Sequence, residues 1–343
     1  MFTYEPWLLY GATGRTGTLI AEEAVRRGHR PVLCGRDPEG LRRLAERLDL
    51  TWVAGPVTEV ARLLGDARLV LLAAGPFGLT SPPVLRACLD AGVHYLDLAN
   101  EIPVVSAALG IGDLAQQRSI TVLPAVGFGT VASDGLACYV ADQVPAAVQL
   151  DLAILLGTDG SSSGARESAM QALGGGGRIR RRGRLMRTRL GAGARRQRTP
   201  IGDRTLVPVP TGDLVVTGHT TGIADITVSF PVPMPPAVAK LVMPVLPVVA
   251  RAAGKLPQRA TRPDSTKEPT GVESYLWARV RAADGRIAQA WLRTGEGYAY
   301  TARAAVLAVE ATLQAEPLGA TTVARAFGPE LSIRAGGELL ATA

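Results

Sequence analysis

The first 145 residues alternate between short apolar runs and longer segments in which apolar residues recur every three or four positions. The apolar runs predict strands, and the periodic segments predict helices. The expected strands cover residues 7–10, 31–35, 51–54, 67–73, 93–96 and 121–124. The expected helices cover residues 16–27, 39–48, 57–64, 83–91, 104–117 and 131–144. This alternation predicts an α/β fold with a doubly wound parallel sheet, the Rossmann arrangement.

Beyond residue 145 the regular alternation stops and a second, α+β domain is expected. Its expected strands cover residues 149–156, 214–216, 223–230, 273–281 and 286–293, the last two joined by Ala-Ala-Asp-Gly, a hairpin signal. Residues 298–313 predict an Ala-rich helix. The chain therefore divides into a dinucleotide-binding domain (1–145), a substrate or oligomerisation domain (146–297) and a C-terminal helical segment (298–343) that packs back on the first domain.

One apolar stretch, residues 230–253, raises the question of a membrane span. It holds six prolines and Lys240, so a buried or interfacial helix pair is the better interpretation than one spanning helix. The N-terminal residues lack the basic region of a signal peptide, and the three cysteines are widely spaced with no CxxC pair. These features predict a cytoplasmic, reducing location without a metal site or membrane insertion.

Three glycines, Gly11, Gly14 and Gly17, follow the first apolar strand and open a helix. In a dinucleotide-binding turn the first glycine permits the tight turn and the second lets the backbone approach the pyrophosphate. The third allows close packing of helix on strand. Backbone N–H groups at the helix start then favour negative charge. The intervening residues complete the predicted phosphate-binding turn: Thr13, Arg15 and Thr16.

The end of the second strand distinguishes the two nicotinamide cofactors. NAD-binding chains usually place an acidic residue there, whereas this chain has Gly35 and Arg36, with Asp37 one residue later. A guanidinium can pair with a 2′-phosphate through its planar fork, with Arg15 as a possible second contact, while Asp37 is placed to cap the next helix. The sequence therefore favours NADP(H) over NAD(H).

Ligands of open α/β sheets lie at the carboxyl ends of the strands. Small residues after the fourth strand would let the ribose and nicotinamide pass, and Phe77 would wall the ring. The expected cofactor contacts in this region are Ala74, Gly75, Pro76 and Phe77, together with Gly127 and Phe128 after the sixth strand.

Three stretches together resemble the saccharopine dehydrogenase-like reductases: GATGRTG…LCGRD, AAGPFGLTSPPVLRACLDAGVHYLDLANE (73–101) and AVGFGTVASDGLA (125–137). A late TGEGYAYTARAAVLAVEATL is similar to the family's closing glycine-tyrosine helix start. The resemblance covers roughly the first 145 residues and is closest to the branch of trans-acting enoyl reductases of lipid and polyketide pathways. It implies a Rossmann domain, a nicotinamide cofactor and a substrate domain with a mixed sheet.

The chain departs from the family pattern after Phe128. Gly129 and Thr130 stand where the family commonly has Asp-Ser, and Ala132 replaces a typical proline, whereas Asp134 is retained. Any role of the missing aspartate therefore does not carry over to this chain.

Hydride transfer usually needs a proton donor beside the cofactor. The predicted catalytic residues are Asp97, Glu101 and Tyr298, drawn from a wider set that includes His94, Tyr95, Asn100, Asp134 and Tyr300. The structural alternatives are a core hydroxyl for Tyr95, a helix-start charge for Glu101 and a helix cap for Asp134. The three lysines form no Tyr-x-x-x-Lys dyad, which disfavours a short-chain dehydrogenase mechanism. His219 fits a structural role.

The net charge of +7 arises from one segment. Ten arginines lie within residues 178–198, so the rest of the chain sums to −3, and residues 168–202 contain no Asp or Glu. This Arg-rich stretch is expected to be a loop. It fits a solvated mobile loop, a site for an anionic substrate such as a phosphopantetheine, CoA ester or carrier protein, or a nucleic-acid or anionic-membrane contact. The absence of interleaved aromatic residues disfavours nucleic acid.

The sequence as a whole predicts an NADPH-dependent reductase that transfers hydride to an activated C=C bond of a conjugated carbonyl, in secondary or lipid metabolism. The expected substrate is a small molecule or a carrier-linked acyl group, and a homodimer is possible. Two alternatives stay open: an imine or opine-type C=N reductase, and a protein that binds NADPH without turnover.

Overall fold

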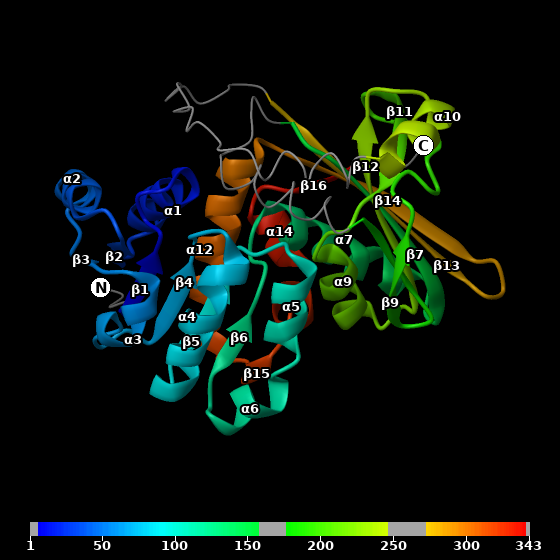
Figure 1. Ribbon diagram of the computed structural model, residues 1–343. Helices are drawn as coiled ribbons and strands as arrows, with labels where there is room; N and C mark the ends of the chain where they lie inside the picture. Colours follow the sequence, from blue (N-terminus) through cyan, green and yellow to red (C-terminus); the bar gives the residue numbers. More distant parts are fainter. Residues whose placement is uncertain (1–5, 158–175, 246–271, 341–343) are drawn as a thin grey trace. The chain divides into compact units, whose positions relative to one another are not determined.

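The computed structural model describes residues 6–157, 176–245 and 272–340, and the chain forms two compact units (Figure 1). One unit comprises Met1–Val131 and Tyr298–Gly336, and the other comprises Ala132–Gly297 and Gly337–Ala343. The chain passes between them within helix α7 (Phe128–Gln143) and returns at the start of helix α12 (Gly297–Ala315).

The first unit is built on a seven-stranded sheet in which every pairing is parallel. The strand order is β15-β6-β5-β4-β1-β2-β3. Because β4 pairs on the opposite side of β1 from β2, the direction of winding reverses between β1 and β4. The strands are β1 (Trp7–Tyr10), β2 (Val32–Gly35), β3 (Trp52–Ala54), β4 (Leu69–Leu72), β5 (His94–Asp97), β6 (Thr121–Leu123) and β15 (Gly319–Ala320). The predicted doubly wound parallel sheet is confirmed.

Helices connect these strands and cover the sheet (Figure 1). They are α1 (Arg15–Arg26), α2 (Pro38–Leu48), η1 (Val57–Glu59), α3 (Val60–Leu63), α4 (Phe77–Ala91), α5 (Ile102–Leu109), α6 (Gly112–Gln117), α12, α13 (Val323–Phe327) and α14 (Glu330–Arg334).

Two predicted helices have different bounds in the structure. The single helix expected over 104–117 is two helices, α5 and α6, because α5 ends at Gly110. Helix α4 begins at Phe77 rather than 83 and continues through Pro82 and Pro83. Its inner face buries Val84, Leu85 and Cys88, and this packing outweighs the hydrogen bonds that the prolines cannot donate.

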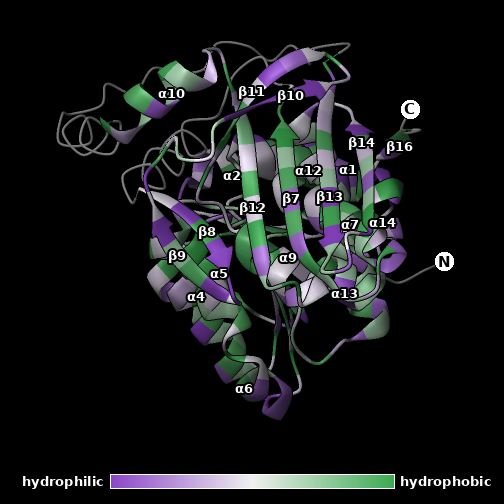
Figure 2. Cartoon of the chain, turned by 90° about the vertical axis from the view of Figure 1, so that its right-hand side faces the viewer, coloured by the Kyte–Doolittle hydropathy of each residue, from purple (hydrophilic) through white to green (hydrophobic). Residues whose placement is uncertain are grey.

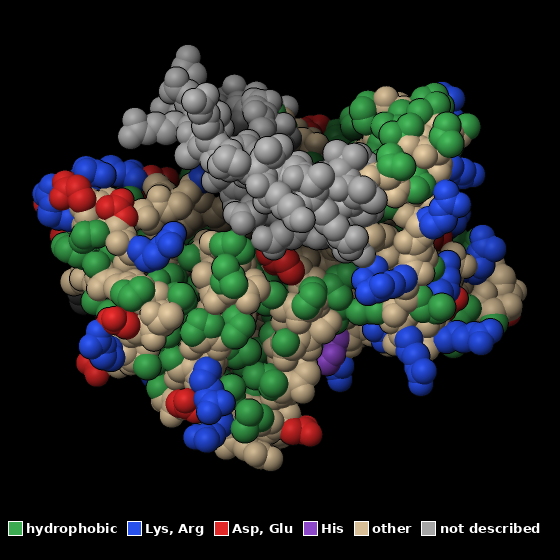
Figure 3. Space-filling view, in the orientation of Figure 1, with side chains coloured by type: hydrophobic (Ala, Val, Ile, Leu, Met, Phe, Trp, Pro, Cys, Tyr) green, Lys and Arg blue, Asp and Glu red, His purple; other side chains and the backbone are tan. Residues whose placement is uncertain are grey.

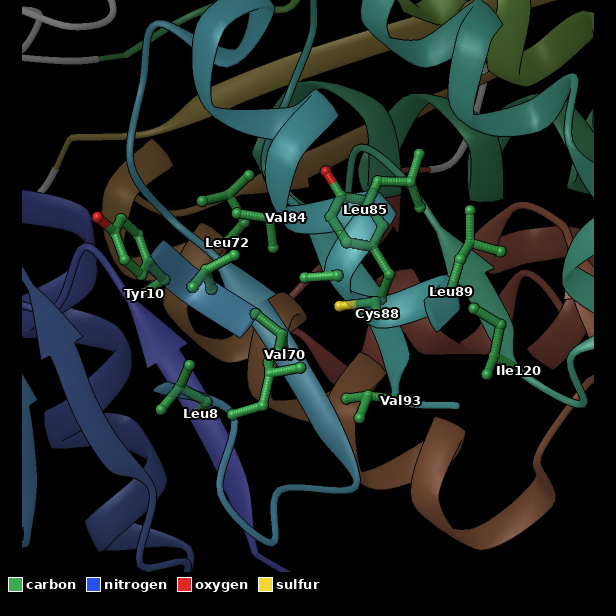
Figure 4. Close-up of a cluster of buried hydrophobic side chains, with 14 of the residues drawn as sticks. Leu8, Tyr10, Val70, Leu72, Val84, Leu85, Cys88, Leu89, Val93 and Ile120 are labelled. Carbon is green, nitrogen blue, oxygen red and sulfur yellow. The ribbon is translucent and has the colours of Figure 1, made fainter. Parts of the chain in front are cut away.

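The core of the first unit explains why strands β1 and β4 are continuous apolar runs. Strands β1 and β4 are buried at every position, as expected for a sheet covered on both faces. Figure 4 shows side chains of both strands packed against helix α4: Leu8, Tyr10, Val70, Leu72, Val84, Leu85, Cys88 and Leu89.

The second unit contains a mixed sheet (Figure 2). Its main path runs β10-β11-β12-β7-β13-β14-β16, with β7 and β12 parallel and the other pairs antiparallel. The hairpin β8–β9 joins this sheet through β12. The strands are β7 (Ala147–Leu155), β8 (Gly177–Arg181), β9 (Arg184–Thr188), β10 (Arg195–Thr199), β11 (Gly202–Pro208), β12 (Asp225–Val232), β13 (Ser274–Ala282), β14 (Ile287–Thr294) and β16 (Glu338–Leu340). The predicted α+β unit and the β13–β14 hairpin are confirmed.

Three predictions for this unit need correction or lie outside the described residues. The strand expected at 214–216 is part of helix α9 (Asp213–Thr221), because Leu214, Val216 and Thr217 are all buried on one helix and Gly222 ends it in the left-handed region. The Arg-rich loop expected over 178–198 instead forms β8, β9 and part of β10, because backbone pairing between neighbouring strands includes the arginines themselves, such as Arg178 with Arg187. Of the helix pair expected within 230–253, α10 (Pro236–Val242) and η2 (Met243–Val245) are described. Residues 230–232 of that stretch complete strand β12, and residues 246–253 lie outside the described residues. No described helix combines the length and apolar character needed to span a membrane.

A buried ionic cluster ties the end of α1 to helix α12. Arg27 donates two hydrogen bonds to Glu310, of 2.7 and 2.6 Å, and His29 Nε2 lies 3.0 Å from the same carboxylate. Burial alone would raise the pKa of Glu310, but the hydrogen bonds from His29 and Arg27 lower it to about 2. Since this pKa lies below the ordinary 4.5, the cluster stabilises the fold above that pH.

We expect Glu310→Gln to lower the free energy of unfolding by about 2–3 kcal/mol at pH 7, because a partly buried guanidinium loses its counter-charge. The wild-type protein should lose the same stabilisation as the pH falls from 4.5 toward 2. Urea unfolding at pH 7 and at low pH measures both effects. The matched control is Glu46→Gln, whose exposed pair with Arg42 is screened by solvent and should contribute much less to the free energy of unfolding. If both variants lost the same free energy of unfolding, the buried position of Glu310 would not be the source of its stabilising effect.

Candidate cofactor-binding site

The glycine turn after β1 has no room for side chains at two of its three glycines. Gly11 has a φ of +94°, and a Cβ there would lie 2.8 Å from the Ala74 backbone nitrogen. A Cβ on Gly17 would lie 2.1 Å from the Gly11 carbonyl oxygen. The turn is held against β2 by Gly11 N–H, which donates to the Cys34 carbonyl at 2.8 Å. The close approach of helix, turn and strand is the arrangement that the glycine spacing predicts.

Helix α1 begins at this turn without a side-chain cap. Its N-cap residue is Gly14, and the first turn contains no acidic residue. The first N–H groups of a helix have no intrahelical partner, and the helix dipole places partial positive charge at the same end. Thr13, Gly14 and Arg15 are exposed, while Thr16 is half-buried. The start of α1 therefore has the geometry and polarity of a phosphate-binding turn.

Arg36 stands exposed at the end of β2, one residue beyond Gly35. Within the described part of the chain it has no ion-pair partner, so its guanidinium is available to a ligand. The next residue, Asp37, accepts a hydrogen bond of 3.0 Å from Gly40 N–H and caps helix α2. The carboxylate at this strand end is therefore used by the fold, as the sequence suggested.

The segment after β4 lies directly beside the glycine turn. Ala74 is the residue that a Cβ on Gly11 would meet, and its carbonyl accepts a hydrogen bond of 2.6 Å from the Thr80 hydroxyl. Gly75 is exposed, and Pro76 and Phe77 are half-buried at the start of α4. The structure thus brings the predicted residues after β4 next to the turn after β1, on the side where the sheet reverses its winding.

Asp97, at the end of β5, is completely buried and joins two loops. Its Oδ1 accepts hydrogen bonds of 2.9 Å from the backbone N–H groups of Ala99 and Ala125. Its Oδ2 accepts a hydrogen bond of 2.6 Å from the Tyr95 hydroxyl, which lies 2.8 Å from Ser81 Oγ. The Asp97 carboxylate therefore holds the loops after β5 and β6 together.

The environment of Asp97 bears on its predicted catalytic role. Burial raises the pKa of Asp97, opposed by the hydrogen bonds from Tyr95 and the two backbone N–H groups. Burial also raises the pKa of Tyr95 well above its ordinary value. Both side chains are 0% exposed. Tyr95 therefore fits the structural role that the sequence offered for it, a hydroxyl in the core, and Asp97 holds the loops around it in place. Sequence reasoning found Asp97 through its position at a strand end but not this function.

Glu101 and Tyr298 occupy different surroundings. Glu101 is the half-buried N-cap residue of α5 and accepts a hydrogen bond of 3.0 Å from Asn100 N–H. The Tyr298 ring lies 3.9 Å below the Arg15 guanidinium, a cation–π contact that links the start of α12 to the glycine turn. Arg15 is therefore not a solitary cation reaching for a phosphate, because its side chain also contacts this ring.

The start of α12 also supports the start of α7. Phe128 N–H donates a hydrogen bond of 3.1 Å to Thr301 Oγ1, and the Phe128 ring meets Tyr300 edge-on, with ring centroids 5.5 Å apart. A Cβ on Gly127 would lie 3.6 Å from the Thr301 methyl group. Thr301 is a site residue that sequence reasoning missed, because its partner is 173 residues away.

The remaining polar candidates are engaged in the fold. Tyr300 is buried and donates to the Ser332 carbonyl at 2.9 Å, and burial raises its pKa. Asp134 lies inside α7, which begins at Phe128, so it does not cap that helix. His94 accepts a hydrogen bond of 2.9 Å from Thr121 N–H, and His219 lies in the last turn of α9. Among the described residues, no group of His, Cys, Asp and Glu side chains forms a metal site.

Comparison with known proteins identifies the first unit. The family model of the saccharopine dehydrogenase NADP binding domain matches residues 7–123, which span β1 to β6. Residues 7–123 are thus similar to the NADP-binding domain of saccharopine dehydrogenases. The match confirms the predicted family resemblance and the nicotinamide dinucleotide as the cofactor class, and the uncapped start of α1 after the glycine turn fits the phosphates of that cofactor.

Relatives of known name match only part of the chain. A trans-acting enoyl reductase of Mycobacterium ulcerans is 29% identical over 138 residues, which are 37% of this chain and 33% of that protein. A probable mitochondrial saccharopine dehydrogenase-like oxidoreductase of Arabidopsis thaliana is 26% identical over 152 residues, 37% of this chain and 32% of that protein. The match therefore covers about a third of the length of these relatives.

A solved structure extends the similarity to both units. The apo saccharopine dehydrogenase (L-Glu forming) of Saccharomyces cerevisiae superposes with a TM-score of 0.66. The match covers 98% of this chain and 100% of that chain at 13% sequence identity. At this identity the match establishes the fold, a Rossmann domain with a second mixed-sheet unit, and not the substrate.

Proposed function

We propose that the protein is an NADPH-dependent reductase that adds hydrogen across an activated C=C bond of a conjugated carbonyl. The proposal rests on one observation, a tight glycine turn at Gly11 and Gly17 together with the exposed Arg36 at the end of β2. Both lie in the segment that matches the NADP-binding domain model. A small-molecule or carrier-linked acyl substrate in secondary or lipid metabolism fits this reaction.

The residues of the first unit have separate tasks in this proposal. NADPH, when bound, supplies the hydride. The start of α1 receives the pyrophosphate, and Arg36 pairs with the 2′-phosphate. The Asp97 carboxylate fixes the loops after β5 and β6, which end in Glu101 and Phe128. Of the predicted proton donors, Glu101 and Tyr298 retain partial exposure and remain the candidates.

A C=N reductase is the second candidate, because the fold is shared with a saccharopine dehydrogenase. The choice of C=C rests on the enoyl reductase relatives, whose similarity is confined to about a third of this chain. A panel of enones and cyclic imines, with NADPH oxidation followed by absorbance, separates the two reactions. NADPH binding without oxidation by any member of the panel would favour a protein that binds the cofactor without turnover.

We expect Arg36→Ala to weaken NADPH binding by about 1–3 kcal/mol, roughly 5- to 150-fold in Kd, and to leave NADH binding nearly unchanged. The reason is the loss of a charged contact to the 2′-phosphate, which NADH lacks. Fluorescence titration of each cofactor measures the effect. Arg43→Ala is the matched control, because it removes an exposed arginine of α2 whose partner is Glu39. A loss of NADH affinity equal to that of NADPH in Arg36→Ala would contradict the proposed contact.

A further inference from the structure

The arginines of the second unit are concentrated on an exposed hairpin. Strands β8 and β9 are joined by Arg182 and Gly183, whose φ values of +48° and +75° suit a tight two-residue turn. Figure 2 shows hydrophilic and hydrophobic colouring mixed along both strands, and Figure 3 shows basic side chains gathered over this part of the second unit. We name the hairpin, residues 177–188, the basic hairpin.

Strand β9 is an outer strand. Among the strands that the structure describes, it pairs with β8 only, and β8 in turn meets β12 at one residue pair, Arg180 with Ile226. The first four residues of β9 are exposed: Arg184, Leu185, Met186 and Arg187. The apolar pair is well exposed, with 38% of Leu185 and 51% of Met186 accessible to solvent. An outer strand presents backbone N–H and C=O groups to another extended chain.

The charges on the basic hairpin oppose one another. Arg178 stands directly across from Arg187, and Arg181 across from Arg184. Like charges directly opposite each other destabilise a strand pair. Burial lowers the pKa of Arg178, and the charge of Arg187 lowers it further. Arg181 lies 3.7 Å from Asp225, whereas Arg184 and Arg187 of β9 have no ion-pair partner among the described residues. Charged side chains on an edge strand can protect a protein against aggregation. That role would not explain two pairs of arginines facing each other, or the exposed Leu185 and Met186 between these pairs.

We propose that β9 is a docking edge for an acidic, extended segment of a partner protein. The order of β9 side chains is basic, apolar, apolar, basic over residues 184–187, and this order is the same in both chain directions. The complementary strand therefore has the order acidic, apolar, apolar, acidic, whether it pairs parallel or antiparallel. Its carboxylates would neutralise the facing arginines, while its apolar residues would cover Leu185 and Met186.

Other occupants fit these observations less well. A second copy of this chain has a net charge of +7 and the same hairpin, so arginine would meet arginine. Single-stranded nucleic acid is commonly bound by stacking of bases on aromatic side chains, and residues 177–199 contain no aromatic residue. An anionic membrane would attract the charges but leave the strand edge unpaired.

The test uses a short fluorescein-labelled peptide with Glu-Val-Val-Glu at its centre and the full-length protein. The control peptide has the same composition with the centre Val-Glu-Glu-Val. We expect the first peptide to bind at least about fivefold more tightly, with an affinity that falls as salt rises. Arg184→Glu/Arg187→Glu should weaken its binding at least about tenfold.

The matched control variant is Arg118→Glu/Arg334→Glu, which makes the same change in net charge at exposed positions of the first unit. Circular dichroism and NADPH titration establish that both variants are folded. The proposal would be overturned if both peptides bound with equal affinity, or if both variants lost the same peptide affinity. Either result would indicate nonspecific attraction between the basic protein and an acidic peptide. Tighter hairpin-dependent binding of oligothymidylate or of phosphatidylglycerol vesicles would overturn it in favour of a nucleic acid or a membrane.

Discussion

Gly17→Ala should abolish measurable NADPH binding and lower the free energy of unfolding by about 3 kcal/mol or more. The added Cβ would lie 2.1 Å from the Gly11 carbonyl oxygen and 2.8 Å from Ala12 Cα. Both are backbone atoms, so no side-chain rotation can relieve the clash. Helix α1 would have to move away from β1, and the phosphate-binding turn would lose its shape. Fluorescence titration and urea unfolding measure the two effects.

The control for this variant is Gly78→Ala. Gly78 is exposed in helix α4, and an added Cβ would meet nothing within 4 Å. Since alanine is the better helix former, this change should be neutral or stabilise by about 0.5–1 kcal/mol. A Gly17→Ala protein with wild-type NADPH affinity would show that the close approach of turn and helix is not needed for binding.

The fold of the first unit could be predicted from sequence because local signals agreed with one another. Strands β1 and β4 are continuous apolar runs, and Gly11 marks the turn from the first strand to the first helix. Where the element bounds went wrong, packing overrode a local signal. The prolines of α4 suggested a helix start at 83, although the buried face of the helix extends to Ser81. Residues 214–216 read as a strand, although helix α9 buries them on one side.

The second unit was harder to predict because its sheet depends on distant partners. Strand β7 pairs with β12 and β13, and arginine-rich strands such as β8 lack the apolar alternation that marks a strand.

Distant partners also limited how much of the candidate site could be predicted. The residues of the glycine turn and Arg36 belong to one β-α-β unit, β1-α1-β2, and their predicted roles follow from this local order. Thr301 and the loop contacts of Asp97 depend on partners brought together only by folding.

Asp97→Ala should lower the free energy of unfolding by about 3–5 kcal/mol, because it leaves several buried groups without a partner. The N–H groups of Ala99 and Ala125 would lose their acceptor, and the Tyr95 hydroxyl would keep only Ser81. Ala125 has a φ of +63°, a left-handed conformation that alanine rarely adopts, and the hydrogen bond to Asp97 helps to hold it there. NADPH affinity of the folded fraction should also fall, since the loops after β5 and β6 lose their common anchor.

The variant Asp97→Asn can keep the hydrogen bonds that hold the two loops, but it removes the negative charge of the carboxylate. Its carbonyl oxygen can accept from both backbone N–H groups, and its amide can donate to the Tyr95 oxygen while that hydroxyl donates to Ser81. We therefore expect a loss of only about 1–2 kcal/mol and NADPH affinity within a few-fold of wild type. Urea unfolding and cofactor titration of both variants give the comparison. If Asn were as damaging to turnover as Ala while the protein stayed stable and bound NADPH, the ionised carboxylate itself would be needed for the reaction, and Asp97 would return as a catalytic residue.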